Sequence, residues 1–154
     1  EAEGVPLYEA GDIQHVKDLA PHRFPFLLVD RILQLDADTH RIVALKNVTG
    51  NEAFWTGLPT AVVPAHLQAE MAAQAGSVLA FASMAQGNNL VFFMSIDQAQ
   101  FIHPVTVGDQ LVIDITAKQR RNFGTARGTL YVGSRQVTTI ALKFAIVAQN
   151  PQAD

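Results

Sequence analysis

The segment from Pro64 to about Met84 constrains the fold more than any other part of this chain. It is the longest stretch with helical patterning, it is rich in alanine, and it is apolar on almost every face. A helix that is apolar all round is a buried helix, so other elements must surround it. Pro64 suits the first helical position, and the polar residues 86–89 supply good C-cap chemistry. The sequence therefore predicts one long buried helix at the centre of the fold.

Strand-like patterns lie on both sides of this helix. They are enriched in β-branched residues and partly alternate, as half-buried strands do. The expected strands are 26–33 and 41–48, joined by the polar stretch 36–40, and then 91–96, 110–118, 125–132 and 136–147. Turn residues separate them. The pattern predicts an α+β domain, with the helix on one face of an antiparallel sheet of about five to seven strands.

Length and composition fit a single domain. The chain has 154 residues, and 49% hydrophobic with 16% charged residues is enough to form a core. A length of this size is typical of one domain, and the high apolar and low charged fractions exclude intrinsic disorder. We expect a flexible arm at 1–12, one domain at 13–148 and a tail at 149–154. Asp12 is expected to cap a short helix that ends before Pro21.

The same composition excludes several kinds of site and partner. The chain lacks cysteine, so it has no disulfide, thiolate nucleophile or cysteine-type zinc site. Its net charge of −3 gives no basic field for nucleic acid or membrane. No apolar run reaches the roughly 18 residues of a membrane-spanning helix, and no signal peptide is visible. The glycines form no phosphate-binding pattern, so no cofactor is expected. We expect a soluble cytoplasmic protein.

Glu70 is the most informative polar residue, because it lies in the second turn of the expected buried helix. An isolated buried carboxylate costs several kcal/mol, so it must be paired, protonated or beside a cavity. His66, Glu70 and Gln74 follow one another at a spacing that places them on one row of the helix. The row fits the wall of a catalytic pocket, and it equally fits a polar gap or a subunit boundary.

The histidines give no metal site. His66 and Glu70 have a spacing compatible with a metal, but the sequence offers no third ligand. A single histidine near a helix start, as His66 is, is more often structural than catalytic. His22 lies at a corner between two prolines and fits either role. The other three histidines are expected at the surface: His15, His40 and His103.

Five segments of the chain resemble motifs of one enzyme family. They are APHRFPFLLVDR at 20–31, IVALKNVT at 42–49, NEAF at 51–54, FMSIDQAQF at 93–101 and PVTVGDQL at 104–111. In this order and spacing they resemble the FabZ-type 3-hydroxyacyl-acyl-carrier-protein dehydratases, and the likeness covers about residues 13–148. The resemblance implies the hot-dog fold, in which a curved antiparallel sheet wraps a long helix.

The resemblance also implies an assembly and a mechanism. Hot-dog subunits pair their sheets edge to edge, and FabZ-type enzymes assemble three such dimers around acyl tunnels. A histidine from the loop before the helix takes the proton next to the thioester carbonyl. A glutamate from the partner's helix protonates the leaving 3-hydroxyl, and a backbone N–H at the helix start polarises the carbonyl. Glu70 stands at the position of that glutamate, with Gln74 at the family spacing.

The loop before the helix departs from the family pattern. Family members carry Gly-His-Phe-Pro-Gly there, whereas residues 57–64 read GLPTAVVP and no histidine occurs from Asn51 to Ala65. Ala65 stands where the family has glycine, and Ser95 replaces a glycine before Ile-Asp. Loss of a general base typically costs about 100- to 10,000-fold in rate.

Three explanations follow: His66 has taken over the role, His22 reaches the site from its corner, or the protein does not dehydrate. Our leading hypothesis is a dehydratase-like hydro-lyase that acts on a 3-hydroxyacyl thioester, with Glu70 catalytic and His66 as the candidate second group; His22 remains a further candidate catalytic residue. A thioesterase or enoyl isomerase that uses Glu70 is the first alternative. A non-catalytic acyl-binding or partner subunit is the second.

The expected ligands follow from the same resemblance. Substrate contacts are expected at five positions: Gln74, Gly57, Ala65, Ser95 and Phe101. The thioester carrier is expected to be acyl carrier protein or coenzyme A. The basic pair Arg120 and Arg121 fits a solvated edge or a docking point for an acidic carrier. A homodimer or a trimer of dimers is expected.

Overall fold

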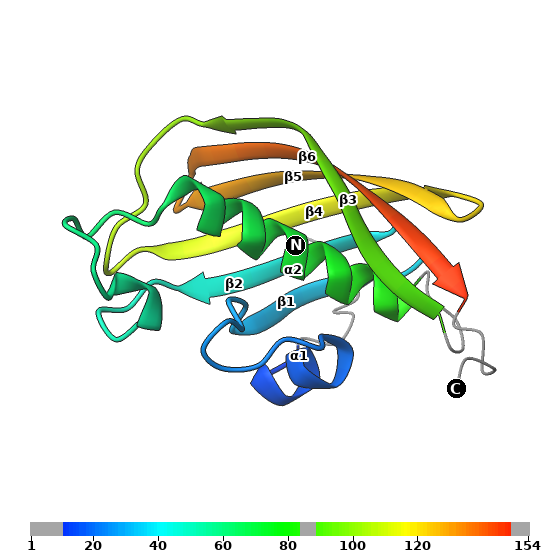
Figure 1. Ribbon diagram of the computed structural model, residues 1–154, viewed down its shortest axis with the longest axis horizontal. Coiled ribbons are helices and arrows are strands. Elements are labelled where there is room, and N and C mark those ends of the chain that lie inside the picture. Colours follow the sequence, from blue (N-terminus) through cyan, green and yellow to red (C-terminus); the bar gives the residue numbers. More distant parts are fainter. Residues whose placement is uncertain (1–10, 84–88, 149–154) are drawn as a thin grey trace, which may run out of the picture.

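The computed structural model describes residues 11–83 and 89–148, and these form a curved sheet around a central helix (Figure 1). The helical elements are α1 (Ile13–Leu19), the 3-10 turn η1 (Ala53–Trp55) and α2 (Ala65–Ser83). The strands are β1 (Arg31–Asp36), β2 (Arg41–Asn47), β3 (Asn89–Phe101), β4 (Gln110–Arg120), β5 (Phe123–Val132) and β6 (Arg135–Ala148).

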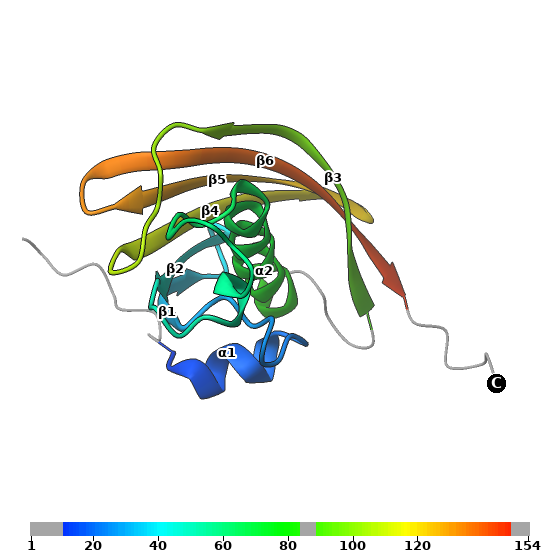
Figure 2. The ribbon, with the colours of Figure 1, turned by 60° about the vertical axis from the view of Figure 1, so that its left-hand side comes forward.

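The strands of this part of the chain form one antiparallel sheet in the order β1-β2-β4-β5-β6-β3. Figure 2, which looks nearly along α2, shows the sheet curving over that helix, with α1 beside it on the other side. The architecture confirms the expected α+β hot-dog fold. Because β3 lies at one end of the strand order, one of its edges has no neighbouring strand within the described residues.

The central helix confirms the prediction from its apolar sequence. α2 begins at Ala65, directly after Pro64, and ten of its residues are buried. It contacts every strand from β2 to β6. Met71, Val78 and Leu79 are fully buried in the core. The C-cap predicted at 86–89 falls largely on 84–88, which lie outside the described residues.

The short first helix also has the expected start. The side chain of Asp12 accepts hydrogen bonds from the backbone N–H groups of Gln14 and His15, so it caps α1. Just before it, Gly11 pairs with Ile32 of β1, with a Gly11 N to Ile32 O distance of 3.0 Å. Neither helix in the described part of the chain has the length and apolar character needed to span a bilayer.

The prediction of a strand over 26–33 was wrong in its first half, because β1 begins only at Arg31. The backbone of Phe26 and Leu28 is hydrogen-bonded by the side chain of Gln74 instead of by another strand. Residues 20–30 therefore form a corner that packs against α2. The opposite difference occurs at β3, which runs from Asn89 to Phe101 and is longer than the predicted 91–96.

Candidate active site

A pocket of about 510 Å³ lies between α2 and the strands β3 and β6. Its walls are mostly apolar: small residues of α2 face aromatic and aliphatic side chains of the sheet. The α2 side includes Ala69, Ala73, Gly76, Ser77 and Phe81. The polar side chains that border the same pocket include His22, His66, Glu70 and Gln74. These are the three members of the predicted helix row together with the histidine of the 20–30 corner.

Glu70 is the acidic side chain of this pocket. It is 29% exposed, so it is neither buried in the core nor free in solvent. Its Oε1 atom accepts a hydrogen bond of 2.8 Å from Gln74 Nε2 and lies 3.7 Å from His22 Nε2. Among the described residues its Oε2 atom has no hydrogen-bond partner, which leaves one oxygen available to a ligand.

Gln74 connects this carboxylate to the corner formed by residues 20–30. Its Nε2 atom donates to Phe26 O at 2.7 Å as well as to Glu70, and its Oε1 atom accepts from Leu28 N at 2.8 Å. Only 1% of Gln74 is exposed. Both N–H groups of the amide are therefore engaged by the protein itself, and we interpret Gln74 as a residue that positions Glu70.

Arginine contacts hold the corner that carries His22. Arg23 Nη1 donates to Ala20 O at 2.8 Å and to His22 O at 2.7 Å, and Arg23 Nη2 donates to Lys17 O at 3.1 Å. The corner is thus tied to α1 on one side and to Gln74 on the other. The His22 Nδ1 atom is buried and has no hydrogen-bond partner. The other ring nitrogen, Nε2, faces Glu70.

The remaining predicted site residues are dispersed. His66 borders the pocket from the first turn of α2, is exposed, and makes no hydrogen bond with the described residues. Four predicted contact positions are absent from the pocket wall: Gly57, Ala65, Ser95 and Phe101. Gly57 lies in an exposed turn with φ of 80°, and Ser95 donates to Asp97 Oδ1 at 3.0 Å. The monomer therefore gathers the helix row and His22, but not the loop positions.

The two arginines of the predicted basic patch occupy the turn between β4 and β5. Arg120 is the last residue of β4, and Arg121 has a left-handed backbone with φ of 57°. Arg120 borders a second hollow of about 390 Å³, together with Lys118, the exposed ring of Phe123, and Lys143. Lys143 also borders the Glu70 pocket, so the two hollows meet at β6.

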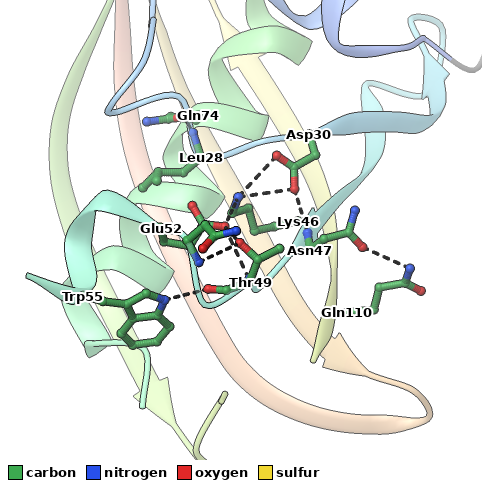
Figure 3. A network of polar contacts seen from close by, with 10 residues as sticks. Leu28, Asp30, Lys46, Asn47, Thr49, Glu52, Trp55, Gln74 and Gln110 are labelled. Carbon is green, nitrogen blue, oxygen red and sulfur yellow. Dashed lines mark hydrogen bonds and ion pairs between the residues drawn. The ribbon is translucent and has the colours of Figure 1, made fainter. Parts of the chain in front are cut away.

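A second polar network ties the loop before α2 to the sheet (Figure 3). The Lys46 side chain, at the end of β2, lies 3.3 Å from both carboxylate oxygens of Asp30 and 2.8 Å from Glu52 Oε1. Trp55 Nε1 donates to Thr49 O at 2.6 Å. The network links the 20–30 corner, which borders the pocket through His22, to the loop that contains η1.

Sequence reasoning missed several residues of this region. Lys46 lies within a segment that carried the family resemblance, but its pairing with Asp30 and Glu52 joins positions that have no periodic relation. Lys143 pairs with Asp97 at 2.9 Å, and hydrogen bonds from Lys143 and Ser95 hold the pKa of Asp97 below its ordinary value. The apolar wall formed by Phe92, Phe93 and other β3 residues was also missed. Its only sequence signal is a run of large apolar residues without strict alternation.

Metal binding finds no support in the geometry. Over residues 11–83 and 89–148, no three histidine, cysteine, aspartate or glutamate side chains gather as a ligand set. His22, His66 and Glu70 border the same pocket but do not form such a set.

Comparison with known proteins agrees with this architecture. The family described as FabA-like domain matches residues 20–141. The 3-hydroxyacyl-acyl-carrier-protein dehydratase FabZ of Pelotomaculum thermopropionicum is 41% identical over 138 residues, which cover 88% of this chain and 98% of that protein. The enzyme of the same name from Wolinella succinogenes is 44% identical over 144 residues, covering 88% and 95%.

Solved structures show the same fold at low sequence identity. The dehydratase heterocomplex ApeI:P from Xenorhabdus doucetiae aligns with a TM-score of 0.70 at 19% identity, covering 88% of this chain and 91% of the other. A mutant thioesterase from Pseudomonas aeruginosa aligns with a TM-score of 0.72 at 13% identity, covering 94% and 100%. At these identities the likeness establishes the fold alone.

Proposed function

Because this chain belongs to the FabZ-type family of 3-hydroxyacyl-acyl-carrier-protein dehydratases, we propose that it removes water from a 3-hydroxyacyl thioester and forms the 2-enoyl thioester. It is an enzyme of the hydro-lyase class. The observation that carries the proposal is the placement of Glu70 in an apolar pocket with one carboxylate oxygen free for substrate. Relatives that are about 40% identical over nearly their whole length bear the dehydratase name.

The chemistry needs groups that move protons and a pocket that excludes water. The thioester carbonyl acidifies the hydrogen on C2, and the hydroxyl on C3 leaves once it is protonated. A carboxylate close to both atoms can serve as acid or base. Glu70 is the carboxylate of this pocket. The backbone N–H groups of Ala65 and His66 at the start of α2 are the candidate donors for the thioester oxygen, because those of Leu67 and Gln68 already donate to Pro64 O.

The acyl chain is proposed to lie along α2. Ala73, Gly76 and Ser77 follow Glu70 on the helix and border the same pocket, so they leave room for methylene groups beside the carboxylate. The facing wall contains apolar side chains of β3 and β6, among them Leu142 and Phe144. Apolar walls with few polar groups are typical of pockets that bind an acyl ligand.

Mass spectrometry of a panel of 3-hydroxyacyl thioesters tests this function. Wild-type protein should convert substrate to a product lighter by one water, and Glu70→Gln should form none. The buried variant Gln68→Leu serves as a control for nonspecific damage to α2, because Gln68 contacts Val63 and Thr138 instead of the pocket. Release of free acid would identify thioester hydrolysis instead, and unaltered dehydration in Glu70→Gln would refute the assignment.

The thioester carrier is proposed to be an acyl carrier protein, as the names of the relatives state for those enzymes. Such a partner is acidic, and the described turn between β4 and β5 offers Lys118, Arg120 and Arg121 beside exposed Phe123. Opposite charges across an interface steer association.

The double variant Arg120→Glu, Arg121→Glu should weaken carrier binding about tenfold or more in a titration at low salt. Arg135→Glu, at the start of β6 and outside this turn, is the control for charge reversal, and equal affinity of both variants would refute this docking point.

The chain is proposed to form a homodimer through the free edge of β3. This strand has thirteen residues, and Phe92, Phe93 and Met94 on it are at least half exposed. A long apolar edge strand invites pairing with another strand. Light scattering coupled to gel filtration distinguishes a monomer, a dimer and a trimer of dimers. A monomer at micromolar concentration would refute the proposal.

A further inference from the structure

The two oxygens of Glu70 have different surroundings, and this difference limits how the residue can act. Oε1 accepts the 2.8 Å hydrogen bond from Gln74 Nε2 and faces His22 Nε2 at 3.7 Å. Oε2 has no hydrogen-bond partner among the described residues. A proton on Glu70 would therefore sit on Oε2, because Oε1 is already an acceptor. Oε2 is the atom that takes or gives a proton in the pocket.

His22 is held in a form that cannot exchange a proton with substrate. Its Nδ1 atom is buried without a partner, so a hydrogen on Nδ1 would be a buried donor with no acceptor. The neutral imidazole therefore carries its hydrogen on Nε2, the nitrogen that faces Glu70. In this tautomer, further protonation would occur at the buried Nδ1, which substrate does not reach. His22 thus presents an N–H to Glu70 and is not a base for the C2 proton.

His66 is the other imidazole at the pocket, and nothing fixes its ring. It is exposed in the first turn of α2 and makes no hydrogen bond with the described residues. A general base needs a defined position within hydrogen-bond reach of the proton that it removes. Glu70, in contrast, is oriented by Gln74 from the same helix and faces His22.

Resting on the proposed function, we propose that Glu70 alone makes both proton transfers of the dehydration. Ionised Glu70 takes the proton from C2 onto Oε2, and the electron pair of that C–H bond passes into the thioester enolate. The enolate then forms the C2=C3 double bond while the C3–O bond breaks. The same proton passes from Oε2 to the departing hydroxyl, which leaves as water. Glu70 returns to its ionised state, so the turnover balances without a second titrating group.

His22 and Gln74 are positioning residues in this scheme. Both act at Oε1, which lies 2.8 Å from Gln74 Nε2 and 3.7 Å from His22 Nε2, and this leaves Oε2 for the substrate. The thioester oxygen of the enolate is stabilised by the N–H groups of Ala65 and His66 at the start of α2, whereas those of Leu67 and Gln68 donate to Pro64 O. In this scheme Glu70 makes both proton transfers and Gln74 positions it, so no histidine base is needed. The scheme therefore explains why Glu70 and Gln74 are present although residues 51–65 contain no histidine.

The pH dependence of kcat/KM separates one proton-transfer group from two. The titratable groups that face Glu70 or its pocket are His22, His66 and Lys143, and the Lys143 ammonium is paired with Asp97. A single carboxylate that starts ionised gives a rate that rises through one ionisation and then stays level. A histidine base with a protonated glutamate acid gives a bell-shaped profile. The wild-type protein should show the level profile.

Substitutions at His22 test the positioning role. His22→Gln keeps an N–H donor that does not titrate, and it should reduce kcat by less than about tenfold without a new limb in the pH profile. His22→Leu removes the donor and should reduce kcat about 100-fold or more, the usual effect of losing one oriented donor. His66→Gln should keep the level profile. His103→Gln, exposed and outside the pocket, is the matched control.

The outcomes distinguish this inference from the proposed function. If the wild-type protein forms no enoyl product, the function itself fails. If it forms the product through Glu70 but shows a bell-shaped profile, the one-carboxylate scheme fails and the function stands. The scheme is also overturned if His66→Gln loses activity about 100-fold, or if His22→Gln is as slow as His22→Leu.

Discussion

The ammonium group of Lys46 lies 2.8 Å from Glu52 Oε1, although the Lys46 side chain is only 5% exposed. The same ammonium lies 3.3 Å from both oxygens of Asp30, so one buried cation joins the 20–30 corner to the loop before α2. Removing a buried charge leaves its partners uncompensated, which is far more costly than losing a surface ion pair.

Lys46→Met should therefore lower the free energy of unfolding by about 3 kcal/mol, measured by urea denaturation. Methionine fills the space of the lysine stem, so the loss reflects the two carboxylates left unpaired. The control is Lys118→Met, an exposed position on β4, where a change within about 0.5 kcal/mol is expected. Equal stability of the two variants would show that the pairing of Lys46 contributes nothing.

A second prediction concerns Gln74 and its matched control Gln68. Both are buried glutamines on α2, but Gln74 serves Glu70 and the 20–30 corner, whereas Gln68 contacts Val63 and Thr138. Leucine at either position leaves buried polar groups unsatisfied, so each variant should lose about 2–3 kcal/mol of stability. Only Gln74→Leu should also lose about 100-fold in kcat at a temperature where both are folded. Similar kcat values would contradict a positioning role for Gln74.

The central features of the fold could be predicted from local sequence. Pro64 and the apolar composition that follows it determine where α2 begins and why it is buried, and Asp12 caps α1 as its side-chain chemistry suggests. The corner at 20–30 could not be predicted in this way. Phe26 and Leu28 have strand-like sequence, yet their backbone groups bond to a side chain that lies 46 or 48 residues later in the chain.

The site could be predicted in part for the same reason. The row of His66, Glu70 and Gln74 follows from helical spacing, and the structure places all three at one pocket. The closeness of His22 to Glu70 depends on how the corner folds back onto α2, which no periodicity encodes. The pairing of Lys46 with Asp30 and Glu52 likewise joins residues from three separate segments.

Acid pH provides a third prediction, at the turn between β1 and β2. Asp36 accepts hydrogen bonds from the backbone N–H groups of Thr39 and Asp38, and the bond from Thr39 is the main reason why its pKa is lowered from 3.8. The stabilising effect is therefore complete above this ordinary pKa and disappears as the pH falls through the lower folded-state value. Asp36→Ala should melt at a lower temperature than the wild type at neutral pH, and the difference should vanish in stronger acid. A difference that stays constant with pH would refute this role.

The last prediction concerns Gly124, because the ring of Phe144 packs directly against its backbone. A Cβ atom added at Gly124 would overlap the ring of Phe144, so the ring must move. Phe144 borders the Glu70 pocket, and a displaced ring changes the space for the acyl chain. Gly124→Ala should therefore lose about 1–3 kcal/mol of stability from overpacking and should shift the preferred acyl length in kcat/KM.

Gly50→Ala, where the nearest atom lies at 4.0 Å, is the control for an added methyl group. Combining Gly124→Ala with Phe144→Leu should restore much of the stability, because the smaller side chain removes the clash. An unchanged acyl preference in both Gly124 variants would show that this wall does not contact the acyl chain.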